Sequence, residues 1–97
     1  MTYFSKRWLT TLERARDVSV LDLLDRMGRD TPKRSGKELK ALCPLHEDKN
    51  PSMSITRDGM QWYCFACAEG GDAIRLYLRL HPRMRFRDAV DEMSHWL

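Results

Sequence analysis

Two short motifs, each with a pair of cysteine or histidine residues, decide how this chain folds. They are Cys43-Pro-Leu-His46 and, after the seventeen residues 47–63, Cys64-Phe-Ala-Cys67. The chain has three cysteines, and all of them lie in these two pairs. A two-residue spacer lets both side chains of one tight turn reach a single ion, at bond lengths of about 2.0–2.3 Å for zinc. Because thiolate and imidazole ligands favour zinc over magnesium or calcium, the spacing predicts one zinc ion bound by Cys43, His46, Cys64 and Cys67.

Two other interpretations of the cysteines compete with zinc. Cys64 and Cys67 could form a redox pair, but such a pair should open a helix after a strand of a βαβ unit, whereas this one precedes Gly70-Gly71. The three cysteines could also be buried core residues beside an incidental histidine. Zinc explains all four residues at once, and four protein ligands leave no position for a catalytic water. We therefore expect a structural zinc that performs no chemistry.

Length and composition place the chain among ordinary globular domains. A chain of 97 residues is expected to form one domain, and a domain of this size often needs a metal or disulfide for stability. Charged residues make up 32% and hydrophobic residues 42% of the chain, and no apolar stretch approaches the roughly 18 residues of a membrane span. No secretory signal is visible at the start. These features predict a cytoplasmic protein without membrane association.

The segments around the zinc ligands carry the signals of both helices and strands. Helical periodicity covers 5–16 and 19–27, with Ser19 as the N-cap and Gly28 as the residue that ends the second helix. Strand signals cover 38–42, 53–56 and 60–65, with Ser35-Gly36 and Asp58-Gly59 as turns. Asp72 is a candidate N-cap for a third helix, which Pro82 ends, and helical spacing then runs from Phe86 to the end.

This pattern predicts an α+β fold in which a small antiparallel zinc ribbon is flanked by N-terminal and C-terminal helices. We expect a single domain over 1–97, with a helical lead-in at 1–28, the zinc ribbon at 29–71 and C-terminal helices at 72–97.

The positive charges are clustered although the net charge is only +3. Between Arg75 and Arg87 there are five arginines and no acidic residue. A second basic stretch holds Lys33, Arg34, Lys37 and Lys40. Such clusters are typical of a polyanion-binding surface, and a plain solvated surface is an equally good interpretation from charge alone.

The two ligand pairs and their neighbours resemble the Cys-His-Cys-Cys zinc-binding domain of bacterial DnaG-type primases. The likeness lies in Cys43-Pro-Leu-His-Glu-Asp-Lys-Asn-Pro-Ser-Met53 and in Trp62-Tyr-Cys-Phe-Ala-Cys-Ala-Glu-Gly-Gly-Asp-Ala-Ile74, and it extends over about 18–80. The departures from the family pattern are Asn50, Met53 and two alanines, Ala66 and Ala68, in place of glycines. An alanine at either position is a problem only if the backbone there needs a positive φ.

The resemblance implies a zinc ribbon that contacts single-stranded DNA and helps a primase to start a primer. The residues at the matching positions are Lys49 and the basic pair Lys33 and Arg34. Aromatic side chains often stack on bases in single-strand binders, which adds Trp62 and Tyr63 as candidates, whereas Phe65 is expected near the metal.

The chain itself is not expected to be an enzyme. Nucleotidyl transfer needs clustered carboxylates that hold two metal ions, and no two aspartates here are two residues apart. No P-loop or nucleotide fingerprint is present either, so no small-molecule substrate is predicted. We expect a stand-alone module that acts with a primase, polymerase or helicase in trans. The alternative is a zinc-stabilised protein-interaction module of a replication or mobile-element complex.

Overall fold

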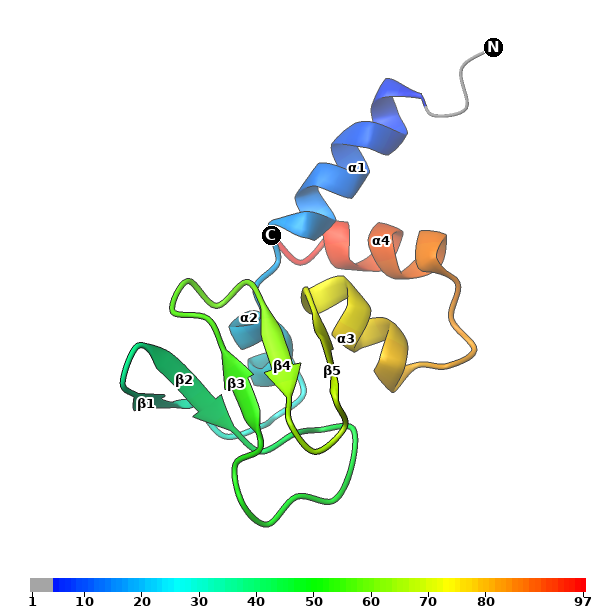
Figure 1. Ribbon diagram of the computed structural model, residues 1–97. Helices are drawn as coiled ribbons and strands as arrows, with labels where there is room; N and C mark the ends of the chain where they lie inside the picture. The colour runs from blue at the N-terminus through cyan, green and yellow to red at the C-terminus, as the bar shows by residue number, and fades with distance from the viewer. Residues whose placement is uncertain (1–4) are drawn as a thin grey trace.

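Five short strands form one antiparallel sheet in the computed structural model, which describes residues 5–97 (Figure 1). The strands follow one another across the sheet in chain order: β1 (Lys33–Ser35), β2 (Glu38–Ala41), β3 (Met53–Ile55), β4 (Trp62–Cys64) and β5 (Glu69–Gly71). Four helices complete the fold: α1 (Lys6–Arg16), α2 (Val20–Arg26), α3 (Ala73–Leu80) and α4 (Phe86–Ser94). The predicted α+β class, with an antiparallel ribbon between helices, is confirmed.

The predicted helix ends are confirmed where the capping residues were identified. The Ser19 hydroxyl accepts a hydrogen bond from the Asp22 amide at the start of α2, and the Asp72 carboxylate does the same for Arg75 at the start of α3. Gly28 follows α2 with a φ of 73°, a left-handed conformation that glycine adopts without strain. These caps are local interactions, which is why the sequence alone located them.

Two of the five strands, β1 and β5, were not predicted. The Gly70-Gly71 segment belongs to the edge strand β5, which pairs with β4. A side chain at Gly70 would place its Cβ 2.3 Å from the carbonyl oxygen of Trp62. The absence of a side chain therefore lets β5 approach β4 closely.

The two faces of the sheet have different surroundings. In Figure 1, α2 lies behind the sheet and α3 lies beside β5. Met53, Ile55 and Trp62 share one face of the sheet and belong to the buried core that also contains side chains of α2 and α3. Strand β3 is buried along its whole length, because its outward residue Ser54 lies between Lys40 and Tyr63 of the neighbouring strands.

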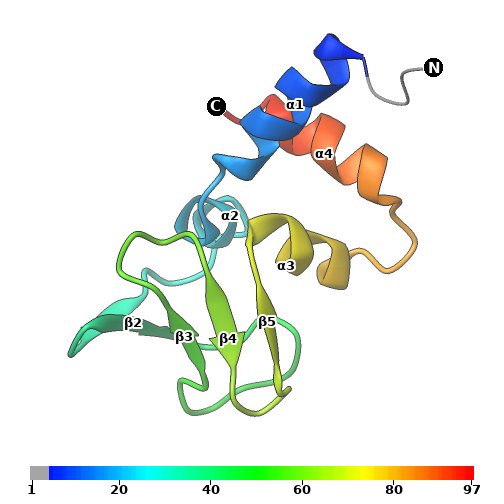
Figure 2. The same ribbon diagram turned by 45° about the horizontal axis from the view of Figure 1, so that its top comes forward.

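Helices α1 and α4 pack on each other beyond one end of the sheet, as both views show (Figures 1 and 2). Their contact buries Ala15 of α1 and Ala89, Val90 and Met93 of α4. Within the described part of the chain, no helix has the length and apolar character needed to cross a bilayer. The opposite end of the sheet carries the loops with the predicted zinc ligands.

Candidate metal centre

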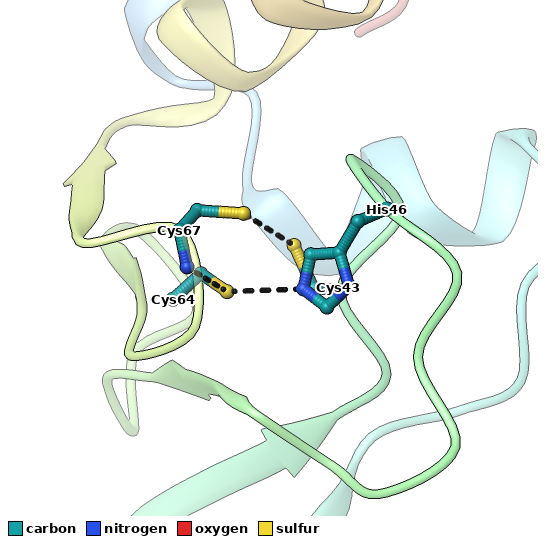
Figure 3. A group of neighbouring side chains, drawn as sticks. All are labelled: Cys43, His46, Cys64 and Cys67. Atoms are coloured by element: carbon teal, nitrogen blue, oxygen red, sulfur yellow. Dashed lines mark hydrogen bonds between the residues drawn. The ribbon is translucent and has the colours of Figure 1, made fainter.

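The four predicted ligands come from two loops at the same end of the sheet. Cys43 follows β2 by two residues, and Cys64 is the last residue of β4. Both strands pair with β3, where Met53 is opposite Ala41 of β2 and Cys64 of β4. Because β2 and β4 run in the same direction on either side of β3, their ends bring the two ligand pairs together (Figure 3).

The four ligand atoms form a group of the size that one zinc ion requires. All of them lie within 4.8 Å of one another. The Cys43 and Cys67 sulfurs are 4.0 Å apart, and the Cys64 sulfur lies 3.6 Å from His46 Nε2. In a tetrahedral zinc site with bonds of about 2.3 Å, neighbouring ligands are about 3.8 Å apart. The donor set and its spacing therefore fit one structural zinc ion.

Neighbouring groups orient the ligands. His46 Nδ1 lies 3.1 Å from the Glu47 carbonyl oxygen, a contact that leaves Nε2 facing the centre of the group. The Cys67 amide donates to the Cys64 sulfur over 3.3 Å, and the Ser52 hydroxyl lies 3.5 Å from the same sulfur. These contacts restrict the side chains before a metal binds.

Asp48 holds the first loop together from outside the ligand group. One of its carboxylate oxygens accepts hydrogen bonds from the Cys43 amide (2.9 Å), the Ser52 amide (3.2 Å) and the Ser52 hydroxyl (2.8 Å). The Cys43 amide is the main cause of a lowered pKa for this carboxyl, and the Ser52 hydroxyl and amide contribute further. Asp48 thereby connects a metal ligand to the segment that enters β3.

The thiols have unequal proton affinities without metal. Burial raises the pKa of Cys43 to about 12 and is also the main cause of the raised pKa of Cys67. Burial acts in the same direction on Cys64, but hydrogen bonds from Ser52 and the Cys67 amide outweigh it and bring the pKa of Cys64 to about 6. The metal-free site thus favours one thiolate, and a divalent cation is needed to stabilise three thiolates together.

The exposed face of the sheet carries part of the predicted DNA site. The strand registers align one row of residues on that face: Lys33, Lys40, Ser54, Tyr63 and Gly70. Tyr63 is 43% exposed, and its ring is 5.1 Å from that of Phe65 in an edge-to-face arrangement. Lys40 Nζ lies 5.1 Å from the Phe65 ring centre. We call Lys33, Lys40, Tyr63 and Phe65 the basic–aromatic face.

Three sequence-based expectations change at this point. Trp62 is only 3% exposed and its indole nitrogen donates to the Asp72 carbonyl oxygen over 2.8 Å, so it is a core residue and not a stacking surface. Phe65, expected near the metal and not among the stacking candidates, follows the ligand Cys64 directly and is 65% exposed, so its ring joins the candidates for stacking. Arg34 lies opposite Leu39, in the row that contains Trp62, and therefore on the other face of the sheet from Lys33.

Lys40 and Phe65 are the residues of this face that the sequence-based site lacked. A two-residue turn at Gly36-Lys37 places Ser35 opposite Glu38 and therefore Lys33 opposite Lys40. The turn signal at Ser35-Gly36 could have identified this pair. No local signal fixes the side to which Phe65 turns, since it lies beyond the end of β4.

Comparison with known proteins identifies the family. The model of the CHC2 zinc finger family, a DnaG-type zinc ribbon, matches residues 9–97. The chain is 35% identical over 78 residues to a DNA primase of Pseudomonas putida, an alignment covering 79% of this chain and 12% of that protein. It is 32% identical over 77 residues to the DNA primase of Escherichia coli K12, covering 79% and 13% of the two chains.

A solved structure has the same fold. The Aquifex aeolicus primase, crystallised as its zinc-binding and RNA polymerase domains, superposes with a TM-score of 0.68 and 24% identity, over 90% of this chain and 21% of that one. The matched segment of this chain corresponds to about an eighth of the length of each of the two sequence relatives. Together with the ligand geometry, these matches show that the chain belongs to the CHC2 zinc finger family, as a zinc-binding domain of the DnaG primase type.

Proposed function

We propose that this domain binds single-stranded DNA on the basic–aromatic face and acts, without chemistry of its own, with a primase, polymerase or helicase in trans. The observation that carries the proposal is the row across the exposed sheet face from Lys33 and Lys40 to Tyr63, with the ring of Phe65 beside Tyr63 and Lys40. Lys49, on the zinc loop, is the third proposed phosphate contact. A cytoplasmic location accords with this role.

The chemistry of the face suits a single strand. Single-strand binders combine cations that follow the phosphates with aromatic rings on which bases stack, at about 1–3 kcal/mol per base. Neither Lys33 nor Lys40 forms an ion pair within residues 5–97. Glu38, two residues before Lys40 on β2 and on the same face, accepts a hydrogen bond from the Ser54 hydroxyl. The face therefore offers unpaired cations beside exposed rings.

The role in priming is proposed from the relatives. The two sequence relatives compared above are named DNA primases, and the matching family model is that of a zinc finger. A closed four-ligand site holds the fold and leaves no coordination position for a substrate. We infer that nucleotide transfer is supplied by a partner and that this domain contributes template contacts.

Fluorescence anisotropy with a labelled oligo(dT) at several salt concentrations tests the DNA proposal. We expect binding in the micromolar range or weaker. Lys33→Gln should reduce the slope of log affinity against log salt by about 0.7, the value for one phosphate contact of a single strand. Arg34→Gln is the matched control, because it removes the same charge one residue away on the opposite face and should leave the slope nearly unchanged.

A second variant separates stacking from charge. Tyr63→Ala should lower the affinity by the equivalent of about 1–3 kcal/mol with little change in the salt slope. If Lys33→Gln and Arg34→Gln behave alike, the face is not the DNA site. If the wild-type protein does not bind at low salt, the proposed DNA function is wrong.

The alternative, a protein-interaction module, is supported by the surface of α3 and α4. Phe86 is 49% exposed and lines, with Arg75 and Arg79, a hollow of about 260 Å³. The arginines of this stretch are less available than the sequence suggests, since Arg79 binds Glu69 through two hydrogen bonds and Arg87 lies over the Trp8 ring. Absence of oligonucleotide binding would favour this alternative.

A further inference from the structure

A second basic feature lies beside the basic–aromatic face, between the end of α2 and the zinc loop. It is a hollow of about 410 Å³. Four basic residues line it: Arg29, Lys33, Lys40 and Lys49. They come from three separate segments of the chain, the linker after α2, the β1–β2 hairpin and the zinc loop. The fold therefore gathers charges that are as many as twenty residues apart in sequence.

Positive charges outnumber negative charges in the lining of the hollow. Asp30 is the one acidic residue in its lining. None of the four basic side chains forms an ion pair with any described residue, in contrast to Arg79 of the other hollow, which is bound by Glu69. A concave surface with several unpaired cations attracts an anion more strongly than a flat one does.

Part of the lining is apolar, and we call this part the apolar floor. Leu24, Leu42 and Pro51 contribute to the lining, and Leu42 is 40% exposed. Sites for small ligands are typically about 300–1,000 Å³ in volume and combine apolar walls with a few polar groups. Cations beside an apolar floor suit a ligand that has both a phosphate group and a flat apolar part. A nucleotide has this composition, whereas inorganic phosphate would use only the cations.

We propose that this hollow binds one nucleotide, with its phosphates at Arg29 and Lys49 and its base or sugar over Leu42. The inference rests in part on the proposed function, because Lys33 and Lys40 belong to both surfaces. The nucleotide is either a free nucleoside triphosphate or one unit of a bound strand, and the two sources share the same phosphate chemistry. Lys40, which also lies over Phe65, connects the hollow to the basic–aromatic face.

The experiment follows backbone amide NMR signals of the zinc-loaded protein during titration with ATP, adenosine, inorganic triphosphate and oligo(dT). Gly28 and Leu42 report on the hollow, and Glu13 of α1 reports on a distant surface. The test variant is Arg29→Gln/Lys49→Gln. The control variant, Lys6→Gln/Arg14→Gln, removes two positive charges from exposed positions of α1. Zinc content is measured for each protein, which verifies that the fold is intact.

We expect ATP to shift the Gly28 and Leu42 signals and adenosine to have a much smaller effect. Inorganic triphosphate should bind more weakly than ATP, because it makes no contact with the apolar floor. The test variant should weaken ATP binding by about tenfold or more, since it removes two charge-assisted contacts, and the control variant should change it little. If only oligo(dT) shifts these signals, the nucleotide is part of a strand.

The inference is overturned if neither ATP nor oligo(dT) shifts Gly28 and Leu42, or if the two variants weaken binding equally. The two proposals fail separately. If ATP leaves the hollow unshifted while oligo(dT) shifts Tyr63 and Phe65 but not the hollow, this inference is refuted and the DNA site stays intact. ATP bound in the hollow of a protein that does not bind oligo(dT) would refute the DNA proposal and leave this inference intact.

Discussion

The two ends of this molecule are stabilised in different ways. Where α1 packs on α4, Ala15, Ala89, Val90 and Met93 are fully buried and supply an apolar core. At the other end of the sheet, residues 42–52 form a loop without regular structure, and the fully buried side chains there include the thiols of Cys43 and Cys64. The first end is held by packing, and the second by the metal site.

The difference follows from what each segment can bury. A helix of nine to eleven residues, such as α4 or α1, presents an amphipathic face that packs on a partner. A loop rich in polar residues has no such face, so a metal ion must supply the free energy that orders it. The comparison predicts that disturbing the two ends will have different consequences for zinc content and for stability.

Loss of a zinc ligand should have the largest effect. Structural zinc contributes about 10–16 kcal/mol in peptide systems, as much as the whole stability of a small domain or more. We expect Cys64→Ser, or removal of zinc by a chelator, to unfold at least the sheet, and the amide NMR signals of Met53 and Ile55 should lose their dispersion. A zinc-free protein that retains dispersed signals and a cooperative thermal transition would contradict this prediction.

A cavity in the helical end should destabilise the protein without releasing zinc. Met93→Ala removes a fully buried side chain and is expected to lower the free energy of unfolding by about 2–5 kcal/mol, measured by urea titration. Zinc content, measured by mass spectrometry of the native protein, should stay at one ion. The control Leu97→Ala changes a side chain that is 64% exposed and should have little effect. Zinc loss in Met93→Ala at low denaturant would show that the two ends are not separable.

Loss of the Asp48 contacts should weaken the metal site without abolishing it. Asp48→Ala leaves the Cys43 amide and Ser52 without their shared acceptor. Groups that orient metal ligands typically contribute about 10–100-fold to affinity, and we expect a loss of that size in competition with a chromophoric chelator. Glu47→Ala is the control, because the contact of Glu47 with His46 uses its backbone carbonyl. Equal affinities for the two variants would contradict the role of Asp48.

The smallest effect is expected at the turn after the second ligand pair. Ala68 has a φ of 57°, a left-handed conformation whose strain destabilises the folded state by about 1–2 kcal/mol for an alanine. A glycine has no such strain, but it loses about 0.5–1 kcal/mol more conformational entropy on folding than alanine does. Ala68→Gly should therefore raise the free energy of unfolding by up to about 1 kcal/mol.

Ala66→Gly is the matched control for this turn. Ala68 is the one non-glycine residue with positive φ in the described range, so Ala66 gains no relief from glycine and its substitution should be slightly destabilising. A destabilised Ala68→Gly variant in urea titration would refute the argument.

The sequence by itself determined the features that depend on neighbours in the chain. The two ligand pairs were recognisable because a two-residue spacer within one turn suffices to bring their side chains together. The helix starts at Ser19 and Asp72 were recognisable for the same reason, since an N-cap bonds to an amide three residues away. The family likeness also rests on these local patterns.

Only the tertiary structure decided which side chains face solvent and which distant segments meet. Trp62 and Tyr63 are adjacent in sequence, and the alternation of a strand shows only that they point to opposite faces. Trp62 lies on the face that packs into the core with side chains of α2 and α3, so it is buried, whereas Tyr63 on the other face is exposed. In the same way, the hollow joins Arg29, Lys33 and Lys49 from three segments. Register and helix packing are long-range interactions, and a pattern of neighbouring residues does not encode them.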